Sequence, residues 1–259
     1  MESHVHHMHK GPSQGWKHYF FEFLMLFLAV FCGFLAENIR EHGVERKKEK
    51  QYMRSLWLDL QEDTSSLRDI SSRFAQSNKN IDTLIRILKS SYKNDSTCKI
   101  YRLAMTIPFA DRIPQPDNKT FEQLKNSGNL RLIHNNELLT KIGAYYNRYS
   151  QMMIGGPGQM LFQNRHDLYL FTYELFDMAV FQKLWQTSRS TLRGPIFIDS
   201  CTEKPVLLTN DPMVINKICA RYYYIEMTRS VLSQFWLTPS LLQADSLLAN
   251  LQDQYHFRN

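Results

Sequence analysis

An apolar run near the start of the chain restricts most strongly what this sequence can fold into. Residues 19–36 read YFFEFLMLFLAVFCGFLA, and Glu22 is the only charged residue among them. Counted from Trp16, a helix rising about 1.5 Å per residue covers most of the ~30 Å hydrocarbon core of a bilayer. Trp16 and Tyr19 carry amphipathic rings of the kind that lie at the headgroup level. We therefore predict a transmembrane helix over residues 16–37.

Three other interpretations of this run fit the residues less well. A cleaved signal peptide needs small residues at the cut site, but Phe34 is bulky. A lipoprotein site at Cys32 needs a small residue before it, where this chain has Phe31. A buried helix of a soluble protein remains an alternative, because the stretch without Glu, residues 23–36, is short for a membrane span.

Composition excludes several broad classes of protein. With 259 residues, 22% of them charged and 43% hydrophobic, the chain is neither disordered nor a polytopic membrane protein. The net charge of +6 permits a phosphate-rich partner but does not indicate one. Most of that charge is spread out or lies beside the predicted span, where anionic lipid explains it equally well. We therefore expect the lipid bilayer, and no nucleic acid, as a partner.

Charges flanking the run bear on its orientation. Lys10 and Lys17 precede it, whereas a larger basic group follows it: Arg40, Arg46, Lys47, Lys48, Lys50 and Arg54. The positive-inside rule then favours a cytoplasmic location for the rest of the chain. Acidic residues interrupt the basic group, and long domains translocate despite flanking charge.

Two features inside the run are candidates for function. Glu22 lies one turn inside it, where a carboxylate either carries protons or pairs with a second helix, or else extends to the interface. Ala29, Gly33 and Ala36 place small residues on nearly one face, which is typical of helix packing in membranes.

Helical patterning continues after the run. Residues 37–92 contain no Pro, and steps of three and four connect a mostly apolar seam. The seam consists of Met53, Leu56, Leu60, Asp63, Leu67, Ile70, Phe74, Ser77, Ile81, Leu84 and Leu88. Asp63, Phe74 and Ser77 do not suit a simple dimeric zipper, so we expect packing within the chain. A coiled coil that joins identical chains near the membrane is the alternative.

The remaining residues predict further helices. Thr120 and Gln123 form a capping-box pattern, and Gly128 ends that short helix. Asparagines at 135 and 136 open the next helix, and residues 160–185 show one long helical pattern. Residues 195–198 are the only plausible strand. Asp–Pro at 211–212 and Thr–Pro at 238–239 each open a helix.

The predicted architecture is all-α, with one N-terminal transmembrane helix that continues into a long helix and then an antiparallel helical bundle. The expected parts are a His-rich tail over 1–15, the span over 16–37, a charged neck and long helix over 38–92, and a helical domain over 93–259.

Several segments form a recognisable combination: Glu37-Asn38, the charged residues 45–50, residues 52–60, and residues 120–133, followed by Leu138 and Tyr145-Tyr146. This combination resembles an uncharacterised bacterial family of single-pass, N-terminally anchored membrane proteins. It covers roughly residues 23–147. The resemblance implies an anchor in the inner membrane, a helical domain facing the periplasm, and no known reaction. The chain departs from the basic N-terminal arm of that family, because its own arm is rich in His.

Few residue groups suggest chemistry. The tail histidines are candidates for binding a metal, and a flexible tail is the alternative. They are His4, His6, His7 and His9. An aromatic core could open a pocket lined by Tyr145, Tyr146, Tyr149, Tyr169, Tyr222 and Tyr223. Cys98, Cys201 and Cys219 allow one disulfide with a thiol left over, or none. We find no catalytic motif and expect neither enzymatic activity nor a cofactor.

These observations favour a non-catalytic, membrane-anchored protein for interaction or assembly, with a homo-oligomer or another membrane protein as the partner. One alternative is a subunit of a sensing or ion-coupled membrane complex that uses Glu22. The other is a ligand-sensing helical bundle.

Overall fold

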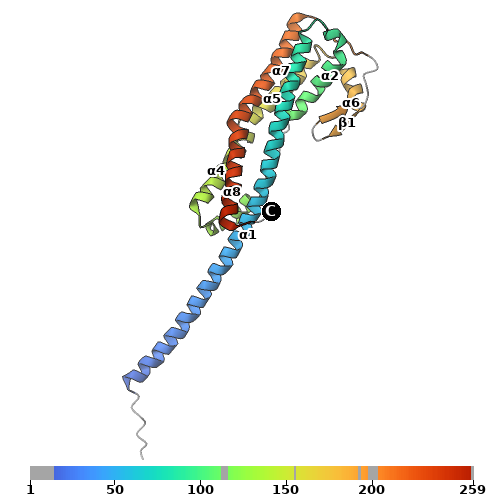
Figure 1. The fold of residues 1–259 in the computed structure, drawn as a ribbon. Coiled ribbons are helices and arrows are strands. Elements are labelled where there is room, and N and C mark those ends of the chain that lie inside the picture. The colour runs from blue at the N-terminus through green and yellow to red at the C-terminus, as the bar shows by residue number, and fades with distance from the viewer. Residues whose placement is uncertain (1–14, 112–115, 155, 192–193, 198–203, 258–259) are drawn as a thin grey trace, which may run out of the picture. The chain divides into compact units, whose positions relative to one another are not determined.

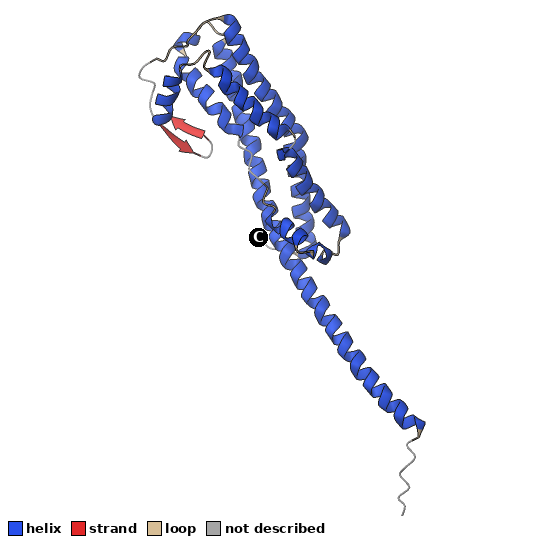
Figure 2. Cartoon of the chain, turned by 180° about the vertical axis from the view of Figure 1, so that it is seen from behind, coloured by secondary structure: helices blue, strands red, loops and turns tan. Residues whose placement is uncertain are grey.

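The computed structural model describes residues 15–111, 116–154, 156–191, 194–197 and 204–257. The chain divides into two compact units, Met1–Gln51 and Tyr52–Asn259. Within the described ranges, helices dominate and a single sheet of two strands is present (Figure 1, Figure 2). The predicted all-α class is therefore confirmed.

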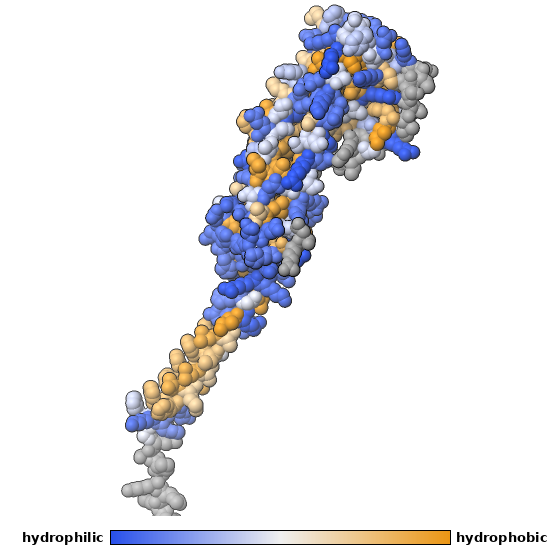
Figure 3. Space-filling model, in the orientation of Figure 1, coloured by the Kyte–Doolittle hydropathy of each residue, from blue (hydrophilic) through white to orange (hydrophobic). Residues whose placement is uncertain are grey.

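The first unit holds the beginning of helix α1 (Trp16–Leu88). Its apolar side chains are exposed, and they form an apolar band on the visible face of this segment (Figure 3). Among the described residues, α1 is the one helix long and apolar enough to cross a membrane, and that stretch is not buried by protein.

The second unit begins at Tyr52 and contains the rest of α1. All members of the predicted seam from Met53 to Leu88 are buried, including Asp63 and Ser77. The nine apolar members belong to one hydrophobic core with residues of the later helices. The expected packing of this seam within the chain is confirmed. Burial of this continuous apolar face is the main reason for the helix to persist, because isolated helices are marginal in water.

The rest of the second unit consists of short and long helices. After α1 come η1 (Lys93–Asp95), α2 (Thr97–Thr106), η2 (Ile107–Asp111), α3 (Lys119–Asn126), η3 (Asn129–Leu132), α4 (Asn136–Ile154), α5 (Pro157–Thr172), α6 (Met178–Gln186), α7 (Pro212–Leu232), the π-helical segment η4 (Ser233–Leu237) and α8 (Thr238–Tyr255). Helix α7 packs on α5, and α8 packs on α4.

The sheet lies between α6 and α7 in the sequence. Strands β1 (Ser188–Thr191) and β2 (Gly194–Phe197) pair antiparallel. The described part of the predicted strand 195–198 is found in β2, and residue 198 lies outside the described residues.

The expected long helix over 160–185 is wrong, because α5 ends at Thr172 and α6 starts at Met178. Between them, Phe176 forms a β-bridge with Leu207. Asp177 then caps α6 by accepting a hydrogen bond from Ala179 N. Apolar periodicity runs through both helices, so the pattern did not reveal the break.

One predicted helix start also needs correction. Helix α3 begins at Lys119, and Thr120 N donates to the Asp59 carboxylate at 3.3 Å, so Thr120 does not open the helix as a cap. The predicted start at Thr238–Pro239 is confirmed, because α8 begins at Thr238 with Pro239 in its first turn. Helix α8 follows η4 without a break, and Thr238 N donates to the Ser233 carbonyl at the spacing of a π-helix.

The starts at Asn135 and Asp211 are confirmed. Asn135 Oδ1 accepts from Leu138 N at the start of α4, and the Asp211 side chain accepts from Met213 N at the start of α7. Gly128 follows α3 with a φ of 70°, the left-handed conformation predicted for its end.

A buried ion pair joins three segments of the second unit. Arg229 of α7 is 0% exposed, and its Nε donates to Asp111 Oδ1 at 2.6 Å. Its other nitrogens donate to Ser77 Oγ of α1 and to the Ile107 carbonyl of η2, both at 2.8 Å. Desolvation lowers the pKa of Arg229 and raises the pKa of Asp111, so each charge depends on the other to remain buried. We refer to these contacts as the Arg229 network.

Replacing Arg229 by Met should destabilise the fold strongly, because it leaves Asp111 buried without its cation. We expect the free energy of unfolding in urea, measured on the detergent-solubilised full chain, to fall by about 3–5 kcal/mol. Arg221→Met is the matched control on the same helix, since Arg221 lies 3.8 Å from Asp167 and both side chains are partly exposed. That control should cost less than about 1 kcal/mol. Equal losses in the two variants would contradict the prediction.

Candidate functional site

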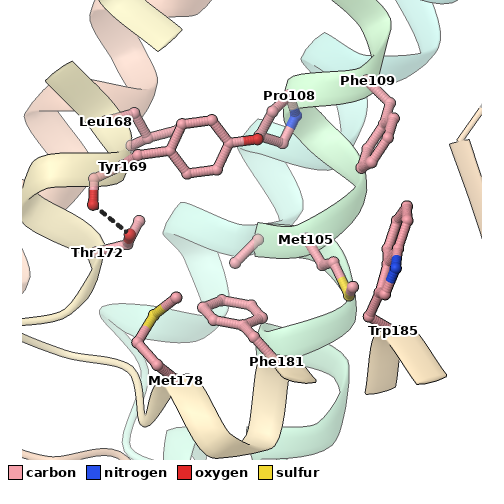
Figure 4. A pocket seen from close by; sticks show the side chains of 10 residues that line it. Met105, Pro108, Phe109, Leu168, Tyr169, Thr172, Met178, Phe181 and Trp185 are labelled. Carbon is pink, nitrogen blue, oxygen red and sulfur yellow. Dashed lines mark hydrogen bonds between the residues drawn. The ribbon is translucent and has the colours of Figure 1, made fainter. Parts of the chain in front are cut away.

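The second unit contains an apolar pocket with a volume of about 170 Å³ (Figure 4). Four elements contribute to it: α2, η2, α5 and α6. The lining residues are Ala104, Met105, Pro108, Phe109, Leu168, Tyr169, Thr172, Met178, Phe181 and Trp185. We call it the aromatic pocket.

The aromatic pocket has a buried floor and an open mouth. Leu168 and Thr172 of α5 are buried in the floor, together with Ala104 and Pro108. At the mouth, Tyr169, Met178 and Trp185 are exposed. The pocket is therefore formed in the folded chain and accessible from solvent.

The Arg229 network positions the η2 wall of the pocket. Arg229 binds η2 at both ends, through the Ile107 carbonyl and the Asp111 carboxylate. Arg73 of α1 adds a contact to the Ala110 carbonyl at 3.3 Å. These buried contacts hold the intervening Pro108 and Phe109 against the pocket.

Tyr101 of α2 positions the α6 wall. Its hydroxyl donates to the Val206 carbonyl at 2.9 Å and accepts from Asp177 N at 2.7 Å. Its ring packs edge-on against Phe176 and Phe181, with centroid distances of 5.1 and 5.3 Å. Burial raises the pKa of Tyr101, so the hydroxyl stays neutral and keeps its proton to donate. The start of α6 is thus tied to α2.

The lining chemistry is almost entirely apolar. The rings of Phe109 and Trp185 stack with centroids 5.8 Å apart and an interplanar angle of 12°. Met105 and Met178 add flexible thioethers, and none of the lining side chains is charged. The side-chain oxygens belong to Tyr169 and Thr172, and the Thr172 hydroxyl already donates to the Tyr169 carbonyl at 2.9 Å. Such a surface suits an uncharged apolar ligand.

A second polar cluster surrounds Asp63 of α1. Asp63 Oδ1 accepts from Asp117 N at 2.8 Å, and its Oδ2 accepts from the Tyr145 hydroxyl of α4 at 2.9 Å. Farther along, Asn129 donates to the Tyr52 hydroxyl at 3.1 Å. The segment that begins at Asp117 is thereby attached to α1, so we call this group the Asp63 cluster. Asn129, in the segment 120–133, therefore has a structural role.

Burial perturbs the ionisation of this cluster. Desolvation raises the pKa of Asp63, and hydrogen bonds from Asp117 N and Tyr145 oppose that effect. Desolvation also raises the pKa of Tyr145, and the nearby Asp63 charge adds to the increase. The tyrosine therefore remains a neutral donor to the carboxylate.

The six tyrosines proposed from the sequence do not gather at one site. Tyr145, Tyr146, Tyr149 and Tyr222 are buried in the core, whereas Tyr223 is exposed on α7. Of the six, Tyr169 is the one that lines the aromatic pocket. The other lining residues were not identified from the sequence. The Phe- and Trp-rich pattern between residues 160 and 185 could have indicated those that α5 and α6 contribute.

Other candidate residues lie in the first unit or outside the described part. Glu22, Ala29, Gly33 and Ala36 are exposed on α1, and a Cβ added at Gly33 would contact nothing within 4 Å. The residues of the tail, His4, His6, His7 and His9, lie outside the described residues. Where the chain is described, no cluster of His, Cys, Asp or Glu could hold a metal ion.

The cysteines differ in their state. Cys98 of α2 is disulfide-bonded. Cys32 and Cys219 are free, the former exposed and the latter buried. Cys201 lies outside the described residues.

No protein-family model matches this chain, and no curated protein or solved structure matches it either. The function proposed below therefore rests on the residues, burial and contacts of the chain itself.

The Asp63 cluster predicts a pH-dependent stability. Because the folded-state pKa of Asp63 is raised, the folded chain binds this proton more tightly than the unfolded chain does. When Asp63 is ionised, above the pKa that it has in the folded chain, the free energy of unfolding is lower. The free energy of unfolding rises again as the pH falls and Asp63 takes up its proton. Relative to Asp63→Asn, which does not titrate, the wild type should become more stable between pH 7 and about pH 4.

Urea unfolding of both full-length chains at several pH values measures this difference. Asp63→Ala is the control for the hydrogen bonds, since it removes the acceptor for two donors. It should cost about 1–3 kcal/mol for each donor that is left buried and unpaired. A wild-type stability that falls relative to Asp63→Asn on acidification would show that the sign is wrong.

Proposed function

We propose that this chain is a non-catalytic, membrane-anchored protein that assembles with further copies of itself through its helical unit. A second apolar face on α7, directed away from the core, carries this proposal. We call this face the outer seam. Its members are Met213, Ala220, Tyr224, Met227 and Val231, and all of them are exposed.

The spacing of the outer seam is that of a helix-packing face. From Ala220 the steps are four to Tyr224, three to Met227 and four to Val231. This alternation repeats about every 3.5 residues, as in coiled coils. Other residues of α7, such as Ile218, Tyr222 and Ile225, fill the core instead. Helix α7 is therefore apolar on two faces, and the second face has no covering helix in the described chain.

A second copy fits this face best. Exposed apolar stripes of this length mark interaction sites, and the heptad-like spacing of the outer seam matches itself. Two chains anchored from the same side of a membrane keep the same orientation, and the anchor raises their effective concentration. A two-fold axis along the membrane normal then brings equivalent residues together, for example Val231 of both copies.

The apolar start of α1 supports the anchor. Its side chains are exposed without any protein cover, which is costly in water and favourable in lipid. The lipid bilayer is therefore the partner proposed for the first unit, and a bacterial inner membrane is the proposed location.

The disulfide supports one side of that membrane. Disulfides persist in oxidising compartments such as the periplasm and are rare in the cytosol. Cys98 is disulfide-bonded, so we infer that the helical unit faces the periplasm. This inference opposes the count of flanking Lys and Arg, but long domains translocate largely regardless of flanking charge.

Ligand sensing by the helical bundle is a second candidate, and the aromatic pocket favours it. The pocket is preformed by two buried polar anchors, the Arg229 network and Tyr101, and it opens to solvent.

A charge placed in the outer seam should weaken self-assembly. Val231→Glu puts a carboxylate opposite its counterpart across the proposed two-fold axis, where both would be desolvated. We expect at least a tenfold increase in the dimer dissociation constant, measured by sedimentation equilibrium of the full chain in density-matched detergent. The control is Ser230→Glu, which adds the same charge at the neighbouring exposed position outside the outer seam. A monomeric wild type, or equal weakening in both variants, would refute assembly through the outer seam.

Thiol labelling tests the proposed compartment. Intact cells are denatured directly in detergent containing a polymer-linked maleimide, which shifts the protein on a gel once per free thiol. We expect two additions before reduction, at the two free cysteines, and four after it. Cys98→Ser should give equal labelling with and without reductant. Four additions to the wild type without reductant would place the helical unit in a reducing compartment.

A further inference from the structure

We propose that the aromatic pocket is a binding site for a small, uncharged aromatic molecule of one ring or two fused rings. This inference does not depend on self-assembly, because the pocket lining comes from α2, η2, α5 and α6 and the outer seam from α7. The proposal specifies the class of ligand for the second candidate function, which is ligand sensing by the helical bundle.

The volume sets the size of the ligand. At about 170 Å³, the pocket is comparable to an apolar cavity of about 150 Å³ that holds one benzene molecule. A single ring fits with a small substituent. A fused ring of indole size fits if part of it extends through the open mouth between Tyr169 and Trp185.

The shape of the lining favours a flat ligand. The rings of Phe109 and Trp185 lie nearly parallel to each other at one side of the pocket (Figure 4). Phe181 presents another ring, and the thioethers of Met105 and Met178 can adapt to a ring edge. Aromatic rings gain from offset stacking and from contacts with sulfur beyond the area that they bury. A flexible aliphatic chain would bury area without these gains.

The polarity of the lining excludes a charged ligand. A carboxylate or ammonium group would lose its hydration in the pocket without meeting an opposite charge among the lining residues. The nearby Arg229 is fully buried and already bound to Asp111, Ser77 and the Ile107 carbonyl. It is therefore not free to pair with a ligand.

The walls are held in place before any ligand arrives. The Arg229 network binds both ends of η2, and the Tyr101 hydroxyl binds the start of α6. The residues of the pocket therefore lose little conformational entropy when a ligand binds. The exposed residues of the mouth, Tyr169, Met178 and Trp185, are the groups that can adjust around it.

Indole is a suitable probe, and the experiment uses the full-length chain in lipid nanodiscs. Ligand-observed saturation-transfer NMR measures binding, and empty nanodiscs measure partitioning into lipid. We expect a saturable indole signal that empty nanodiscs do not give. Indole-3-acetate, which is charged, and 1-hexanol, which is a neutral flexible chain, should each bind at least tenfold more weakly than indole.

Two variants locate the site. Met105→Trp places a second indole ring inside the pocket and should weaken indole binding at least tenfold. Met160→Trp is the matched control, since it makes the same change at an exposed position of α5 outside both the pocket lining and the outer seam. Tyr169→Ala removes an exposed ring from the mouth and should weaken binding severalfold, which gives a test on a variant that disturbs the core little.

Each outcome decides for or against the site. A wild-type signal equal to that of empty nanodiscs overturns the proposal. Unchanged binding in both Met105→Trp and Tyr169→Ala overturns it too, because binding would then occur elsewhere. If Met105→Trp alters the near-ultraviolet circular dichroism relative to Met160→Trp, its fold is disturbed, and the binding measured with Tyr169→Ala alone decides whether the pocket is the site. Hexanol binding as tightly as indole would reject the aromatic class. Self-assembly through the outer seam is measured separately with Val231→Glu. A failure of the self-assembly proposal can therefore be told apart from a failure of the ligand-binding proposal.

Discussion

The ion pair between Arg229 and Asp111 is the interaction on which much of the second unit depends. Through Ser77 it joins α7 to α1, and through Ile107 it joins both helices to η2. A buried pair of this kind adds little net stability compared with apolar residues of the same shape, but removing one partner is severely destabilising. Its structural value is therefore alignment, because the polar contacts are satisfied in only one relative arrangement of the three segments. The wall of the aromatic pocket follows from that arrangement.

The seam of α1 was the most predictable part of the fold. Its spacing depends on the geometry of the helix alone, so a local pattern was sufficient to place its buried face. The polar positions in it, Asp63 and Ser77, looked like interruptions in the sequence. In the structure they are the points where α1 is attached to Asp117 and Arg229, respectively. Their partners lie far away in the chain, so no local pattern could have identified them.

The aromatic pocket was harder to predict for the same reason. The break between α5 and α6 depends on Asp177, which caps one helix while its amide is bound by Tyr101 of α2. Apolar residues on both sides of that break share one periodicity, which led to the prediction of a single helix. The tyrosines drew attention to the core because they are abundant, but most of them fill space or donate hydrogen bonds there. Which rings border an opening is decided by how α2, η2, α5 and α6 meet.

The π-helical segment Ser233–Leu237 determines which way the two ends of the α7–α8 rod face. A π turn carries one more residue than an α turn, so it offsets the phase of everything after it by roughly 100°. Because of this offset, one uninterrupted rod can turn Tyr222 and Ile225 toward α5 and, farther along, Leu247 and Leu251 toward α4. Deleting a single residue there would restore a regular helix and rotate the leucines of α8 out of the core. The length of this short segment is therefore as strict a requirement as the identity of any core side chain.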